Sequence, residues 1–266
     1  MVGQHMTLMM ESPMPVLTVV SPKGGNGKTT IAVNLAVALA RHMPTILVDL
    51  DVHFGDVEYA LRLHPVHRLD KIIEKFQENP ATDLELLLAQ HPSGITAMCS
   101  PNNPLIADGI DVNQCLSVVD KLRELSRPMV IDTAARISEY TLGAIERATH
   151  TILVSGTDVA SVQAGRKLLD TLTEFSMGVD NVRLVVNRST TRSGLTVADV
   201  EAVLGMDAAF EVPEHASIAV STNDGSPITE SSVNSPISQL FYDFVGQIIG
   251  APPAPKRSFW FLRGLK

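Results

Sequence analysis

Several residue types and patterns are scarce in this 266-residue chain, and each scarcity excludes a class of protein. Only two cysteines occur, Cys99 and Cys115, and they do not form a CxxC pair. A disulfide scaffold is therefore excluded, and an iron–sulfur or zinc centre within one chain is poorly supported. No apolar run reaches the roughly 18 residues of a membrane-spanning helix. The start lacks the basic and apolar regions of a signal peptide, so we expect a reducing, cytosolic compartment.

Charge is also limited and unevenly placed. Hydrophobic residues make up 45% of the chain and charged residues 19%, which is enough apolar material for a large core and excludes disorder throughout. The net charge is −8, but four basic residues and no acidic one follow Pro255, so the chain before the tail carries −12. A uniformly basic nucleic-acid-binding coat is thereby disfavoured.

The apolar residues occur in short β-branched runs that alternate with helical patterns. Continuous rather than alternating apolar character predicts parallel strands covered on both faces. The expected strands are Val16–Val20, Ile46–Leu50, Ile95–Cys99, Met129–Asp132, Thr151–Ser155, Val182–Asn187 and Phe210–Val212. The expected helices are Thr29–Arg41 and the stretches around 112–125, 162–175 and 237–248. This alternation predicts an α/β fold with a doubly wound, mostly parallel sheet and helices on both faces.

The same pass along the chain divides it into four parts. Residues 1–14 are Met-rich and irregular, and we expect a flexible leader or a remnant of cloning. Residues 15–250 form the expected α/β domain. Residues 251–255 read as a stiff, proline-rich linker, and 256–266 form a basic, aromatic tail.

The most informative segment is Ser21–Thr30, which follows an expected strand and opens an expected helix. Glycines at 24, 25 and 27 let the backbone fold tightly, so that successive N–H groups point at an anion near the helix N-terminus. Lys28 would reach the β- and γ-phosphates of a nucleotide, and the hydroxyl of Thr29 would bind Mg²⁺. The segment therefore predicts a phosphate-binding loop.

The loop departs from the usual GxxxxGK[ST] pattern, because its first glycine position is Pro22 and an extra lysine, Lys23, precedes the glycines. In this the chain resembles the ParA/MinD superfamily of P-loop NTPases of the SIMIBI type, whose Walker A motif is deviant. The resemblance implies an ATPase that uses ATP and Mg²⁺ and forms an ATP-sandwiched homodimer. It also implies that Lys23 contacts the nucleotide of the partner subunit, as an arginine finger does.

Two strand ends carry carboxylates. Asp49 and Asp51 lie on one face of the second strand at its carboxyl end, where open α/β sheets bind ligands. By resemblance, Asp51 orients the attacking water and Asp49 has a supporting role near Mg²⁺. Asp132 ends a strand that resembles the Walker B strand, and a carboxylate there would hold Mg²⁺, through water. The predicted catalytic residues are Lys23, Lys28 and Asp51, and the predicted metal residues are Thr29, Asp49 and Asp132.

Later segments resemble the adenine pocket of the superfamily. Asn187 ends a strand, and the stretch from Glu211 to Ile228 resembles a motif whose proline lines the base pocket in relatives. Each segment is weak alone, because Asn and Pro commonly end strands. The predicted nucleotide-binding residues are Gly24, Gly25, Asn26, Gly27, Lys28, Thr29, Thr30, Asn187, Arg188, Val212 and Pro213.

The branch within the superfamily is suggested by Gly55-Asp56-Val57, which is most similar to the CpaE/TadZ pilus-assembly branch. Many relatives place a glycine shortly after the Walker B aspartate, as a second switch, whereas this chain has Ala134-Ala135-Arg136. The departure concerns switch motion and the rate of hydrolysis rather than nucleotide binding.

The tail combines four cations with three aromatic residues and two leucines, a composition that suits an interface with anionic lipid. It resembles the C-terminal membrane-targeting helix of MinD in position and composition. The alternative is a tail that packs on its own domain or on a partner. The predicted membrane residues are Lys256, Arg257, Phe259, Trp260, Phe261, Leu262, Arg263, Leu265 and Lys266.

Together these features predict a dimeric, slowly hydrolysing ATPase that positions a membrane-associated machine, such as a pilus or secretion apparatus or the division site. It would be cytoplasmic and peripheral at the inner face of the membrane, with an activating or cargo protein that the sequence does not name. Two alternatives are a ParA-type partition ATPase that binds nonspecific DNA, which the acidic domain disfavours, and a nucleotide-binding scaffold with little hydrolysis.

Overall fold

The computed structural model describes residues 14–191 and 194–250, and its centre is one eight-stranded sheet with the order β3-β4-β2-β5-β1-β6-β7-β8. All neighbours run parallel except β3, which pairs with β4 antiparallel. The strands are β1 (Val16–Val20), β2 (Thr45–Leu50), β3 (Ala89–Gln90), β4 (Ile95–Met98), β5 (Met129–Thr133), β6 (His150–Ser155), β7 (Val182–Asn187) and β8 (Ala208–Val212).

The seven strands expected from the sequence are all present, with bounds that differ by at most two residues. Continuous apolar runs identified them because β1, β2, β4 and β5 are buried along their whole length. The short edge strand β3 was missed, since two residues carry no periodicity.

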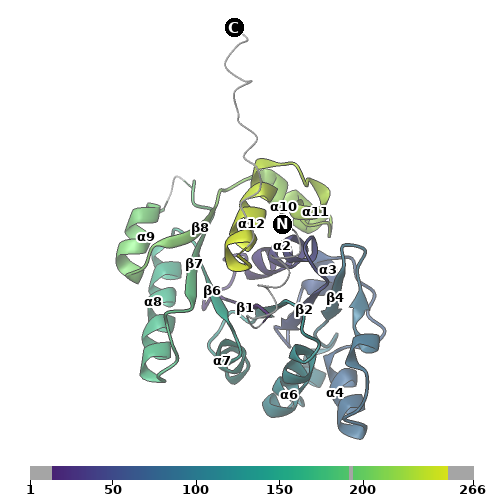
Figure 1. Cartoon of the computed structure of the whole chain (residues 1–266). Coiled ribbons are helices and arrows are strands. Elements are labelled where there is room, and N and C mark those ends of the chain that lie inside the picture. The colour runs from purple at the N-terminus through teal and green to yellow at the C-terminus, as the bar shows by residue number, and fades with distance from the viewer. Residues whose placement is uncertain (1–13, 192–193, 251–266) are drawn as a thin grey trace.

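Helices cover both faces of the sheet, as predicted, and Figure 1 shows the two layers. One layer holds α2 (Lys28–Ala40), α3 (Val57–Ala60), α10 (Ala216–Asn223), α11 (Ile228–Ser231) and α12 (Pro236–Ile248). The other holds α4 (Leu69–Glu78), α6 (Val112–Arg123), α7 (Glu139–Glu146), α8 (Val159–Glu174) and α9 (Val197–Leu204). The short helix α5 (Pro104–Ala107) comes after β4 in the chain, and the 3₁₀ turn Leu84–Leu87 comes after α4.

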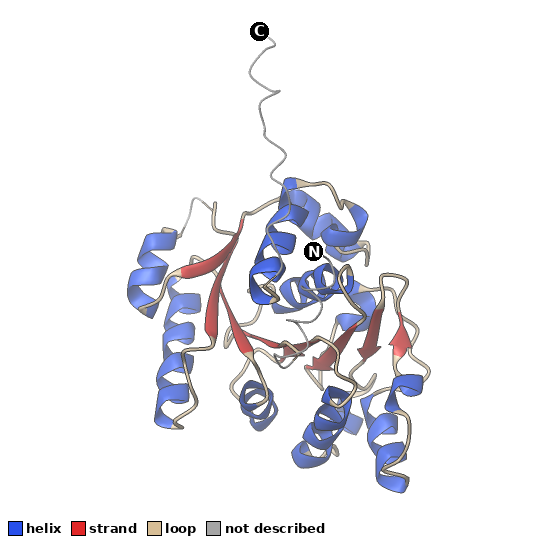
Figure 2. Cartoon of the chain, in the orientation of Figure 1, coloured by secondary structure: helices blue, strands red, loops and turns tan. Residues whose placement is uncertain are grey.

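The four helices that the sequence predicted are α2, α6, α8 and α12. Helix α2 is buried on most sides because α12 and α11 cover the face that the sheet leaves free. Phe210 of β8 stacks on Phe244 and meets Phe241 edge-on, with ring centroids 5.0 and 5.1 Å apart, which fixes α12 to the sheet. Figure 2 shows the helix α12 lying over the sheet in the same layer as α2. Both cysteines are buried free thiols, so no disulfide contributes.

The topology places three loops together at the carboxyl edge of the sheet. Strand β5 lies between β1 and β2, and its Asp132 is in register with Asp49 of β2. The loops after β1, β2 and β5 therefore meet, and these are the loops that the sequence singled out. Among the helices of residues 14–191 and 194–250, none has the length and apolar character needed to cross a bilayer.

The structure does not test the predictions for the leader and for the tail. Residues 1–13 and 251–266 lie beyond the part of the chain that the structure describes. The proline-rich linker and the membrane residues therefore stay predictions from the sequence.

Candidate functional site

The loop between β1 and α2 has the backbone of an anion-binding loop. Gly25 and Gly27 adopt left-handed conformations, with φ of 81° and 85°, which residues with a Cβ rarely adopt. A Cβ on Gly27 would also lie 2.5 Å from the side-chain nitrogen of Asn187. Gly27 forms the N-terminal cap of α2 without a side chain, so the first N–H groups of the helix stay available for a ligand.

Lys28 extends from the first turn of α2 and is only 8% exposed. Burial lowers the pKa of its ammonium group, and the nearby carboxylates of Asp132 and Asp51 raise it in part. A buried ammonium that forms no salt bridge among the described residues is a costly arrangement in the free protein. It is suited to a site that receives a polyanion.

Thr29 and Asp132 join the loop to β5. The hydroxyl of Thr29 donates to Oδ2 of Asp132 across 2.6 Å. Oδ1 of Asp132 is buried and has no hydrogen-bond partner among the described residues. Burial raises the pKa of Asp132 to about 7, and the Thr29 hydrogen bond and the charge of Lys28 oppose that shift.

A free carboxylate oxygen next to a hydroxyl is a donor set that fits Mg²⁺, directly or through water. Of the three residues predicted to bind Mg²⁺, the structure brings Thr29 and Asp132 into direct contact. Their role as ligands stays a prediction, because the observation concerns their geometry alone.

Asp49 has a different environment. Its side chain is fully buried, and its two oxygens accept the backbone N–H groups of Asp51 at 3.1 Å and Val57 at 3.3 Å. Burial is the main cause that raises its pKa well above the usual value. A Cβ on Gly55 would lie 2.1 Å from Oδ2 of Asp49, so the loop after β2 closes tightly over this carboxyl. The contacts of Asp49 thus hold the loop that carries Asp51, and its role near Mg²⁺ stays a prediction.

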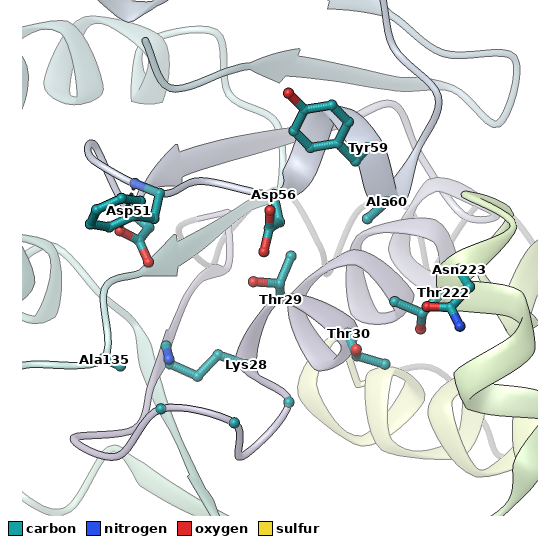
Figure 3. A pocket seen from close by; sticks show the side chains of 14 residues that line it. Lys28, Thr29, Thr30, Asp51, Asp56, Tyr59, Ala60, Ala135, Thr222 and Asn223 are labelled. Atoms are coloured by element: carbon teal, nitrogen blue, oxygen red, sulfur yellow. Dashed lines mark hydrogen bonds between the residues drawn. The ribbon is translucent and has the colours of Figure 1, made fainter. Parts of the chain in front are cut away.

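A cavity of about 610 Å³ opens above the phosphate loop, within the range of small-molecule sites. It is lined by residues predicted for the site together with others: Gly24, Gly25, Gly27, Lys28, Thr29, Thr30, Asp51, Phe54, Asp56, Tyr59, Ala60, Ala135, Thr222 and Asn223. Figure 3 shows the side chain of Lys28 reaching toward the end where Ala135 and Asp51 lie. That end is where the terminal phosphate would be, because this lysine reaches the β- and γ-phosphates in such loops.

The sequence reasoning missed several residues of this cavity. Asp56 turns its carboxylate toward Thr29, and Tyr59 lies at the side of the cavity away from the phosphate loop (Figure 3). Thr222 and Asn223 close the wall from the end of α10. The signal for Asp56 was its place in Gly55-Asp56-Val57. Thr222 and Asn223 lie in the stretch from Glu211 to Ile228, whose resemblance to the base-pocket motif was applied only around its proline.

The ammonium group of Lys23 contacts residues of its own subunit. Its ammonium donates to Oδ1 of Asp158 at 2.7 Å and to the hydroxyl of Ser161 at 3.3 Å. Asp158 also caps α8 by accepting the N–H of Ser161. The hydrogen bond from Lys23 is the main cause that lowers the pKa of Asp158. Asn26 joins the same cluster, since Ser161 donates to its side-chain oxygen.

The residues predicted for the adenine pocket lie apart from the large cavity. The amide of Asn187 donates to the backbone oxygen of Asn26 at 2.8 Å and thereby braces the phosphate loop. Asn187 and Arg188 line a separate cavity of about 130 Å³. The carbonyl of Val212 accepts the N–H of Ser189, and Pro213 follows it at the end of β8. Contact of these residues with a base stays a prediction.

A family model and individual relatives both match this chain over most of its length. The family model described as "CobQ/CobB/MinD/ParA nucleotide binding domain" matches residues 17–228. An uncharacterized ATP-binding protein of Methanocaldococcus jannaschii is 27% identical over 239 residues, 88% of each chain. The septum site-determining protein MinD of Thermotoga maritima is 24% identical over 244 residues, again 88% of each chain.

Solved structures share the fold. A ParA family ATPase from Chlorobium tepidum superposes with a TM-score of 0.80 at 21% identity, over 87% of this chain and 97% of that one. The septum site-determining protein MinD with Mg-ADP from Pyrococcus horikoshii gives 0.77 at 19% identity, over 88% and 96%. The similarity to the pilus-assembly branch is not specifically confirmed by these relatives. With its deviant phosphate loop and its parallel sheet, the chain belongs to the CobQ/CobB/MinD/ParA family of nucleotide-binding domains, within the ParA/MinD superfamily.

Proposed function

We propose that this protein is a slowly hydrolysing ATPase that dimerises around ATP and positions a membrane-associated machine. The observation that carries the proposal is the group formed by Lys28, Thr29 and Asp132. It joins a buried ammonium, a hydroxyl that donates to Asp132, and a buried carboxylate oxygen with no partner among the described residues, and Lys28 and Thr29 line the cavity. The family membership supports ATP as the nucleotide. The fold of a relative with Mg-ADP supports Mg²⁺ as the ion.

The chain's own residues divide the work of binding. The left-handed glycines and the first turn of α2 would surround the phosphates with N–H groups. Lys28 would neutralise the β- and γ-phosphates, while Thr29 and Asp132 hold the metal ion. Bound Mg²⁺ would neutralise charge that develops on the phosphoryl oxygens.

In this proposal Asp51 orients the attacking water. It lines the Lys28 end of the cavity, and its carboxylate accepts only the N–H of Phe54, at 3.3 Å, among the contacts of the described residues. A second lone pair on this carboxylate could hold a water in line with the terminal phosphate.

Dimerisation would require Lys23 to change partner. In the present structure its ammonium is bound to Asp158, so reaching the nucleotide of a second subunit means breaking a 2.7 Å contact that is half exposed to solvent. Such a half-exposed pair is worth little, so ATP could displace it. We therefore assign the Lys23–Asp158 pair to the monomer.

Two variants test this dimer model. Lys23→Ala should bind ATP but lose the ATP-dependent dimer in size-exclusion chromatography with light scattering. Asp158→Asn retains a good helix cap for α8 but removes the charge, so it should dimerise at least as readily as the wild type. A dimer fraction in Lys23→Ala equal to that of the wild type would sink the trans-acting lysine.

Membrane association is tested with the intact protein and a chain ending at residue 255. Each is sedimented with anionic liposomes and, separately, incubated with DNA at several salt concentrations, in ATP and in ADP. We expect tail-dependent, ATP-enhanced binding to liposomes, because a dimer presents two tails. Binding to DNA with a steep salt dependence, and none to lipid, would replace the membrane role with that of a partition ATPase.

The rate of turnover decides between the switch and the scaffold. Phosphate release should be slow but measurable with Mg²⁺ and should be abolished in Asp51→Ala. Tight ATP binding with no release above the Asp51→Ala background, with or without liposomes, would indicate a scaffold that binds nucleotide without hydrolysing it.

A further inference from the structure

Three segments meet at His53, beside the cavity. Its Nε2 lies 2.9 Å from Oδ1 of Asp108, which directly follows α5. Its Nδ1 lies 3.4 Å from NH2 of Arg136, in the loop after β5. His53 itself belongs to the loop after β2, two residues from Asp51. One imidazole thus links the two loops that form the Lys28 end of the cavity.

The chemistry of the three side chains fixes which atoms donate. A carboxylate only accepts and a guanidinium only donates. Both contacts can therefore form together only when Nε2 of His53 carries its proton and Nδ1 presents a lone pair to Arg136. The neutral Nε2–H form of His53 is the one that satisfies both neighbours, and it leaves the positive charge of the group on Arg136 alone.

The guanidinium is free to bind an anion. Arg136 forms no ion pair with a carboxylate within residues 14–191 and 194–250. It follows Ala135, which lines the cavity, and its guanidinium contacts His53, which is two residues from Asp51, another lining residue. Lys28 reaches toward the same end (Figure 3). Arg136 itself is exposed beside the cavity rather than part of its lining, so it would turn toward a bound triphosphate.

We propose that Arg136 binds the terminal phosphate of a nucleoside triphosphate and that His53 holds its guanidinium in place for that contact. This rests on the proposed nucleotide function and adds a residue that distinguishes triphosphate from diphosphate. A planar guanidinium donates two parallel hydrogen bonds to phosphate oxygens, which suits a γ-phosphate better than a bridging one. Lys23 is bound to Asp158 in the monomer, so Arg136 is the cation that we assign to the terminal phosphate in addition to Lys28.

Affinity for two nucleotides tests the assignment. Wild type, Arg136→Gln and Arg136→Lys are titrated by calorimetry with Mg²⁺ and either ADP or the non-hydrolysable analogue adenosine 5′-(β,γ-imido)triphosphate. Arg136→Gln should weaken the triphosphate about tenfold or more and leave ADP within about twofold, because only the terminal phosphate loses a charge-assisted hydrogen bond. Arg136→Lys should recover part of that loss. Equal changes for both nucleotides, or none, would overturn the assignment.

Two variants of His53 separate its contacts. His53→Asn keeps an acceptor near the position of Nδ1, so it should retain most of the preference for the triphosphate. His53→Gln places its polar atoms near Nε2, so it keeps a donor for Asp108 but loses the acceptor for Arg136, and the preference should fall. Identical behaviour of the two would remove His53 as the positioning residue.

The failure of this inference is distinct from failure of the proposed function. If the wild type bound neither nucleotide, the proposed function would fall and the inference with it. If the wild type bound the triphosphate analogue more tightly than ADP and Arg136→Gln kept the same ratio, the ATPase proposal would stand and the role of Arg136 would be wrong. Thermal unfolding of each variant without nucleotide confirms that the fold is intact.

Discussion

At the scale of single residues, the site is built from groups that the free protein holds at a cost. Lys28 and Asp132 are both buried, and desolvation is the main cause of the pKa shift of each. Groups of this kind destabilise the free fold and are suited to a ligand that restores their partners. Function and stability should therefore respond in opposite directions when either residue is replaced.

The first prediction concerns Lys28. Lys28→Ala should weaken ATP binding at least a hundredfold, because the cation that neutralises the β- and γ-phosphates is lost. The melting temperature without nucleotide should not fall, because a desolvated ammonium is removed. Calorimetric titration and thermal unfolding measure the two effects. Lys71→Ala, which removes an exposed lysine of α4, is the matched control and should change neither.

The second prediction concerns pH. The pKa of Asp132 is about 7 in the folded protein and near 3.8 when unfolded, so the folded state binds the extra proton between these values. Stability in EDTA should therefore fall as pH rises from about 4 through 7, with the loss complete above that. Asp132→Asn should flatten the decline and raise the melting temperature at pH 8, leaving the part due to Asp49.

This comparison needs thermal melts at pH 5 and pH 8 of both proteins, with Asp207→Asn, an exposed aspartate of the loop before β8, as the control. If the stability of Asp132→Asn fell as steeply with pH as that of the wild type, another group would be the cause of the pH dependence. The same variant should lose Mg²⁺-dependent strengthening of ATP binding, because the free carboxylate oxygen is replaced.

At the scale of elements, the loop between β2 and α3 is packed against a buried carboxyl. Asp49 accepts two backbone N–H groups of this loop, and Gly55 leaves no space for a Cβ between Asp49 and Ser100. The position of Asp51 thus depends on the packing of a neighbour that does not line the cavity.

We therefore predict that Gly55→Ala destabilises the protein by about 1–3 kcal/mol, as overpacking of a closed site does. ATP hydrolysis should fall more than ATP binding, because the displaced loop carries Asp51 while the phosphate loop is unchanged. Denaturant unfolding and single-turnover hydrolysis measure the two. Gly178→Ala, where a Cβ meets nothing within 4 Å, should leave both close to wild type.

At the scale of the whole molecule, the domain and the tail carry charges of opposite sign. The chain before residue 255 carries −12, and the tail carries +4. Two acidic domains repel each other, so a dimer needs contacts made across the bound nucleotide to outweigh that repulsion. The nucleotide state should therefore control assembly.

The last prediction follows for Asp51→Ala. With Mg²⁺ and ATP, this variant should stay a dimer, at twice the monomer mass in light scattering, while the wild type returns to monomer as ATP is consumed. Bound ATP should also raise its melting temperature, since a ligand at a hundred times its Kd stabilises by about 2.7 kcal/mol. A variant that is monomeric in ATP, or that hydrolyses at the wild-type rate, contradicts the role of Asp51.

The outcome for particular elements shows how far sequence reasoning reached. The buried strands and helix α2 were found because their apolar runs are long and continuous. Helices α3, α10 and α11 have eight residues or fewer, and no pattern of that length distinguishes a helix from a loop. The supporting role of Asp49 near Mg²⁺ came from the resemblance and stays a prediction, whereas its hydrogen bonds to backbone N–H groups could not be predicted, because only the folded loop brings those groups to it.

What the sequence determined by itself is local and periodic. It determined the parallel sheet, the phosphate loop with its two lysines, and the set of carboxylates at strand ends, because each of these depends on neighbours in the chain. The tertiary structure alone decided the rest. It bound Lys23 to Asp158, braced the phosphate loop with Asn187, and set His53 between Asp108 and Arg136. Each of these contacts joins residues that are 55 to 161 positions apart in the sequence, because the strand order of the sheet brings their loops together.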